Sequence, residues 1–173
     1  MIANALVHAI QGIFKGYGRI GNVGGDTIIV RQTVPTGAAL YTANDNVGGI
    51  MTLTEVSTQN TRELILQDID LWDTLKQDAI LNVDFWETSP AGTYTDQATQ
   101  VMTGDHAAHL GHVQVVAADY VDDPVISRVT LRNLGITMKP TTDSKNIFMT
   151  IMTPSTPTYA ANGLHMKFGF HRD

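Results

Sequence analysis

The chain has 173 residues and no cysteine, and its 17 acidic and 11 basic side chains give a formal net charge of −6. This length fits one domain with a full core, and the lack of cysteine excludes disulfides, thiol catalysis and zinc–thiolate sites. Scattered acidic charge disfavours nucleic acid as a partner, and no apolar run reaches the about 20 residues that span a membrane, so we expect neither partner.

Residues 1–25 are predicted to form an N-terminal arm, helical or extended. Over residues 2–15 the large apolar side chains recur on one helical face, with polar residues opposite. Those apolar positions are Ile2, Leu6, Ile10, Ile13 and Phe14. A helix this short is marginal alone in water, so it packs either on its own domain or on a neighbouring subunit or larger assembly.

Residues 16–25 are rich in glycine and are predicted to be a hinge. They match Gly-x-Gly-x-x-Gly at Gly16, Gly18 and Gly21. A dinucleotide site requires a strand before this motif and a helix after it. Here a helical pattern precedes it and a strand pattern follows, so a flexible connection is favoured and no cofactor is expected.

Residues 26–173 are predicted to be one β domain. Strand patterns occur at residues 27–34, 50–56, 62–71, 80–86, 113–117, 125–131, 147–152 and 164–171. In 62–71 the apolar parity changes near Gln67, which predicts a β-bulge, and the short break before residue 80 suggests that 62–71 and 80–86 lie side by side in one sheet. Short strands with almost no helix between them predict an antiparallel β-sandwich, with a jelly roll as the most specific choice.

Two alternatives would place chemistry on this sandwich. A predicted helical turn at residues 105–110 would bring His106 and His109 to one face beside Asp105, as metal ligands. However, Gly111 is expected to end the turn before His112, and solvated histidines are favoured, so no metal is predicted. Asp68, Asp70 and Asp84 are candidates for the paired carboxylates of a glycosidase or for a carbohydrate-binding site, but same-face acids also arise on any solvated strand.

Three side chains are candidates for an oligomer interface. Trp86 falls on the strand face opposite Phe85, so it marks an interface if it is exposed, whereas a covering loop or sheet would make it structural. His165 and His171 take outward positions on the last strand.

The run from Val34 through Pro35, Tyr41 and Asp45 to Gly49, followed by a strand, resembles the opening segment of head decoration proteins of tailed bacteriophages. Later pieces follow the same order: residues 65–70, the strand 81–86 with Pro90 after it, and a loop before residues 113–115. Asn44 stands where this family usually has glycine. The resemblance spans residues 27–173 and leaves residues 1–25 uncovered.

The resemblance implies a non-enzymatic virion protein, made in the host cytoplasm, that sits on the outer surface of the capsid, binds the major capsid protein and cements neighbouring capsomers, often as a homotrimer. The five apolar arm positions are then the candidate capsid-binding residues. A tail- or fibre-associated virion protein, and a carbohydrate-binding sandwich or glycosidase, are the alternatives.

Overall fold

A computed structural model describes residues 26–57, 62–141 and 143–172 of the chain. The predicted N-terminal arm, residues 1–25, lies outside these residues. The structure therefore describes only the β domain that is predicted to follow it. In chain order the elements are β1 (Asp26–Val34), β2 (Asp45–Asn46), β3 (Met51–Leu53), β4 (Leu64–Asp73), β5 (Leu81–Trp86), the 3₁₀ helix η1 (Asp105–Ala108), β6 (His109–Val115), the 3₁₀ helix η2 (Ala117–Asp119), β7 (Val121–Asp122), β8 (Ser127–Met138), β9 (Ile147–Thr153) and β10 (Leu164–Arg172). Neither of the described helices is long and apolar enough to cross a membrane.

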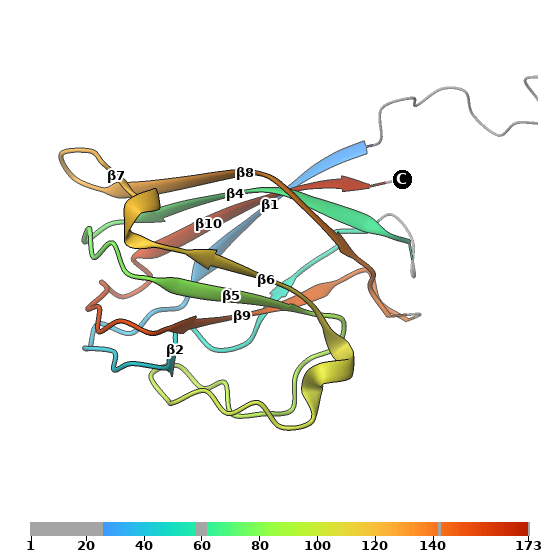
Figure 1. Ribbon diagram of the computed structural model, residues 1–173, viewed down its shortest axis with the longest axis horizontal. Coiled ribbons are helices and arrows are strands. Elements are labelled where there is room, and N and C mark those ends of the chain that lie inside the picture. Colours follow the sequence, from blue (N-terminus) through green and yellow to red (C-terminus); the bar gives the residue numbers. More distant parts are fainter. Residues whose placement is uncertain (1–25, 58–61, 142, 173) are drawn as a thin grey trace, which may run out of the picture.

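The strands form two antiparallel sheets packed face to face, seen as two layers in Figure 1. One sheet has the order β1-β10-β4-β8-β7, and the other has the order β2-β9-β5-β6, with β3 also paired to β9. The pairs are nested along the chain: β1 pairs with β10, β2 and β3 pair with β9, β4 pairs with β8, and β5 pairs with β6. This is the path of a long hairpin rolled into two layers, so the predicted all-β, jelly-roll-like sandwich is confirmed.

The core lies between the two sheets and follows the alternation of the strands. Leu81, Val83 and Phe85 of β5 point inward, as do Phe168 and Phe170 of β10, and all five are fully buried. Phe85 and Phe168 meet edge to face across the sandwich, with ring centroids 6.0 Å apart. The period-2 pattern of the sequence therefore selects the inward face correctly on both strands.

The bulge predicted near Gln67 is also present. The register of β4 shifts between Leu66 and Asp68 against β8, and against β10 the shift falls between Gly169 and Phe170. Gln67 is the extra residue of β4 at this bulge. It shifts the alternation of β4 by one residue, so the apolar side chains before and after it both face the core although their parity differs.

Three local predictions are wrong. β4 and β5 lie in different sheets, since the connection after Asp73 crosses between the layers. β8 runs on to Met138, seven residues past the predicted end, through a second irregularity in which Asn133 and Gly135 have positive φ. β6 begins at His109 and not at residue 113, so the predicted helical turn is limited to η1.

Candidate functional site

The outer face of the β1-β10-β4-β8 sheet carries four of the polar side chains singled out by the sequence: Asp68, Asp70, His165 and His171. Cross-strand partners on this face form successive rows: Thr33, His165, Trp72 and Arg128; then Arg31, Lys167, Asp70 and Thr130; then Ile29, Gly169, Asp68 and Arg132. His165 and His171 are partly exposed here, at the outward positions that the alternation predicts.

Asp68 and Asp70 lie side by side on this face, but each is neutralised by cations from neighbouring strands. Arg132 approaches Asp68 at 3.0 Å and Asp70 at 3.1 Å, and Lys167 forms an ion pair with Asp70. Thr130 Oγ1 also donates a hydrogen bond to Asp70. Burial raises the pKa of the Asp70 carboxyl, but the bonds from Lys167 and Thr130 and the charge of Arg132 outweigh it, so the pKa lies below its ordinary value.

A glycosidase needs a carboxyl group whose pKa is raised so that it can act as a general acid. The depressed pKa of Asp70 is the opposite of that requirement. Asp68 and Asp70, with the cations that bind them, form a cross-strand array of charges. Arg132 and Lys167, which organise this array, were not singled out from the sequence, because the pairing of β4 with β8 and β10 is a long-range feature.

The two tryptophans have different environments. Trp72 is partly exposed on the outer face, and Lys167 Nζ lies 5.8 Å from the centroid of its ring. Trp86 has no exposed surface at all. Its Nε1 donates to Thr150 Oγ1 at 2.9 Å, and its ring packs edge-on against Tyr94 and His109.

The sequence makes Trp86 an interface candidate only if its side chain is exposed, and in the structure this side chain is buried. The long connection between β5 and η1, drawn in yellow-green at the bottom of Figure 1, carries Tyr94 onto this side of the second sheet. Trp86 is thus covered by its own chain, the structural reading that the sequence left open.

Asp84, next to Trp86, is held by two histidines from β6. His109 Nε2 and His112 Nδ1 both lie 3.0 Å from the same oxygen, Asp84 Oδ1. His109 opens a strand, so it shares no helical face with His106, and the metal arrangement drawn from that face is wrong. Among the described residues no group of three or more histidine or carboxylate side chains is placed to hold a metal ion.

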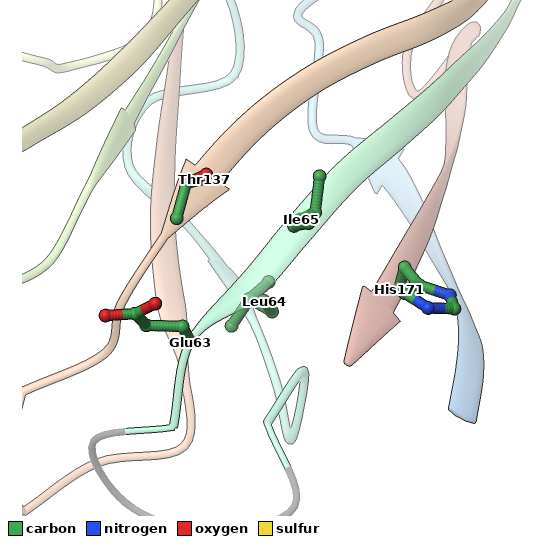
Figure 2. A pocket seen from close by; sticks show the side chains of 5 residues that line it. All are labelled: Glu63, Leu64, Ile65, Thr137 and His171. Carbon is green, nitrogen blue, oxygen red and sulfur yellow. The ribbon is translucent and has the colours of Figure 1, made fainter. Parts of the chain in front are cut away.

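His171 lies at the other end of the outer face from His165 and lines a small pocket. Figure 2 shows its imidazole with the other lining side chains from β4, β8 and the segment before β4. These are Glu63, Leu64, Ile65 and Thr137. The pocket measures about 100 Å³, which is well below the roughly 300 Å³ at which small-molecule sites begin.

The segment that carries the family resemblance, residues 34–49, folds into a turn bound to the long connection after β5. Asp96 fastens the two: its carboxylate accepts hydrogen bonds from Gly37 N, Tyr41 Oη and Gly48 N. Burial, and next the hydrogen bond to Asp96, raise the pKa of Tyr41 far above its ordinary value. The phenol therefore stays protonated and remains a hydrogen-bond donor. No sequence pattern identified Asp96, because its three partners lie 48 to 59 residues away.

Asn44, the departure from the family pattern, has φ of +70°. Asparagine enters this left-handed region more readily than other residues with a side chain. The turn therefore has the conformation that glycine at this position would favour. Asp45 closes it by accepting bonds from Thr42 N and Thr42 Oγ1, at 2.7 and 2.9 Å.

No family model and no curated protein matches this chain. Solved structures that resemble it include a chain of tomato aspermy virus, with 9% identity over 97% of this chain and 93% of that one and a TM-score of 0.40. A CocE/NonD family hydrolase from Staphylococcus aureus shares 12% identity over 89% of this chain and 38% of that one, with a TM-score of 0.43. The C-terminal CBM6 module of a Zobellia galactanivorans laminarinase shares 7% identity over 86% of this chain and 100% of the module, with a TM-score of 0.35. Similar folds thus include viral and carbohydrate-binding proteins, and likenesses this distant carry no argument about function.

Proposed function

We propose that this chain is a non-enzymatic structural protein of a tailed-phage virion, which binds the outer surface of the head and cements neighbouring capsomers. The observation that carries the proposal is the turn at residues 34–49, which bears the resemblance to head decoration proteins. Its one departing residue, Asn44, adopts the left-handed conformation that glycine favours. The jelly-roll sandwich is compatible with this function, although the same fold serves many others.

The charge distribution and the site chemistry fit a protein that adheres. The net charge of −6 suits the outside of a shell better than the side that meets DNA. The carboxylates that would serve a glycosidase are engaged, Asp68 and Asp70 with cations and Asp84 with two imidazoles. Many copies with individually weak contacts attach strongly through avidity.

The arm is the proposed head-binding element. It joins the sandwich at Asp26, whose carboxylate pairs with Arg172 at the end of β10. Its apolar positions Ile2, Leu6, Ile10, Ile13 and Phe14 would enter an apolar groove of the major capsid protein and so add contact area.

Co-sedimentation with undecorated heads tests this function. Leu6→Asp with Ile10→Asp is expected to abolish binding, because the charges fall on the predicted docking face. Asn4→Asp with Gln11→Asp adds the same charge to the opposite face and should leave binding nearly unchanged. Equal binding by both variants would remove the arm from the contact, and failure of the unmodified chain to sediment would reject head binding itself.

Carbohydrate binding is the second candidate, favoured by one observation. Trp72 is partly exposed on an open sheet face between His165 and Arg128, and tryptophan rings are common sugar-stacking platforms. Titration with oligosaccharides should then quench the fluorescence of a Trp86→Phe variant, whereas a cement protein shows no saturable change.

A further inference from the structure

Among the residues that the structure describes, strand β1 has a long edge that pairs with no other strand. It pairs on one side with β10, through nine consecutive residue pairs without a register shift, and it ends the sheet on the other side. Its residues are mostly exposed or partly exposed, and Ile29 has 51% of its surface exposed. A free edge carries a row of backbone donors and acceptors that pair readily with another strand.

The other described edges carry the protections that proteins normally give them. β2, β3 and β7 have two or three residues each. β6 has a register shift opposite Trp86, and the free part of β8 is broken between Arg132 and Ile136. Short strands and bulges prevent edge-to-edge pairing, so among the described edges β1 alone is nine residues long without a register shift.

We propose that β1 pairs antiparallel with β1 of a second copy, about a two-fold axis through Ile29, to join the two sheets into one of ten strands. A two-fold axis normal to the sheet keeps the outer face of one copy continuous with that of the other. In this register Ile29 faces Ile29 of the second copy on the outer side. Ile28 faces Val30 on the inner side, where both are partly buried against the core.

Charge and side-chain chemistry select this register over its neighbours. Centring the axis on Arg31 would place two guanidinium groups opposite each other, and centring it on Val30 would place Ile29 against Arg31. Centred on Ile29, the pairing sets Arg31 against Thr27 and fills the middle of the interface with β-branched aliphatic residues, which suit cross-strand pairs. The strand is thus complementary to itself, which favours a second copy as the occupant.

The proposal goes beyond head binding and does not depend on it. It predicts a mass of two chains of 18.8 kDa in solution, where the resemblance implies three. Ile29→Lys and Ile29→Glu should each weaken association on the order of tenfold, because like charges then face each other directly. An equimolar mixture of the two variants should restore the dimer. Val125→Lys, at an aliphatic residue that is 75% exposed away from this edge, is the matched control and should not change the mass.

Because the chain has no cysteine, the register can be read by disulfide formation. Ile29→Cys should cross-link two copies, since directly opposed Cα atoms lie about 4.5 to 5.5 Å apart, within disulfide range. Thr27→Cys and Arg31→Cys should not cross-link, because each cysteine would lie about 13 Å from the equivalent cysteine of the second copy. A single-chain mass, a mass that Ile29→Lys leaves unchanged, or cross-linking at residue 27 or 31 in place of 29 would overturn the proposal. So would β1 amide protection that is independent of concentration and lost on deletion of residues 1–20, because the chain's own arm would then cover the edge.

Discussion

Replacing Asp96 by alanine should loosen the turn that carries the family resemblance. The carboxylate accepts three hydrogen bonds, at 3.1 Å from Gly37 N, 2.8 Å from Tyr41 Oη and 2.7 Å from Gly48 N. Tyr41 is fully buried, so its hydroxyl has no solvent to replace the lost acceptor. At about 1 kcal/mol net for each bond, the free energy of unfolding should fall by about 3 kcal/mol.

Urea unfolding followed by circular dichroism measures this loss directly. For a domain of this size, 3 kcal/mol corresponds to a fall in melting temperature of about 6 to 12 °C. Asp96→Asn retains one carbonyl oxygen, which can serve Tyr41 and Gly48, so only the bond from Gly37 is lost and about a third of the destabilisation is expected. Asp122→Ala removes a carboxylate from an exposed ion pair with Lys76 and should cost less than about 0.5 kcal/mol. If Asp96→Ala is no more destabilising than Asp122→Ala, the turn is not held by this carboxylate.

Three further outcomes are expected. Gly48→Ala should lower the free energy of unfolding by about 2 kcal/mol or more, because φ is +81° and the added Cβ would lie 2.5 Å from Val34 Cγ1. Gly104→Ala is the control, since its φ is +71° but the space around it is open, and it should cost about 1 kcal/mol. Equal losses in urea unfolding would show that the contact with Val34 has no effect. Because the pKa of Asp70 is lowered on folding, its contribution to stability is complete above the unfolded pKa of about 3.9 and is lost as the pH falls through the folded pKa. The free energy of unfolding should therefore depend less on pH over that range for Asp70→Asn than for the unmodified chain. The same pH dependence in both proteins would show that the pKa of Asp70 is not lowered by folding. Acrylamide should quench the fluorescence of Trp86→Phe, which retains Trp72, much more strongly than that of Trp72→Phe, which retains the buried Trp86, and the reverse order would show that the long connection does not cover Trp86.

Local alternation was sufficient to predict the strands and their buried faces. Leu81, Val83 and Phe85 were placed inward by parity alone, and the change of parity near Gln67 located the bulge of β4. These features depend on residues one or two positions apart, so a single sequence contains them.

Long-range partners were not predictable in the same way. Nothing near Trp86 in the sequence indicates that Tyr94 and Thr150 enclose it, and nothing near Asp70 indicates Lys167. β4 and β5 are neighbours in the chain but belong to different sheets, because the jelly-roll path crosses between layers at that connection. Burial and charge pairing at the candidate site follow from this topology, which periodicity does not encode.

The central proposal is that this sandwich attaches to the outside of a phage head. Electron cryomicroscopy of undecorated heads incubated with the purified chain tests that claim most directly. We predict ordered density on the outer surface, into which the two sheets fit, with a connection from the Asp26 end of β1 into the shell. Heads without added outer density, or density confined to the tail or to the inner surface, would contradict the account.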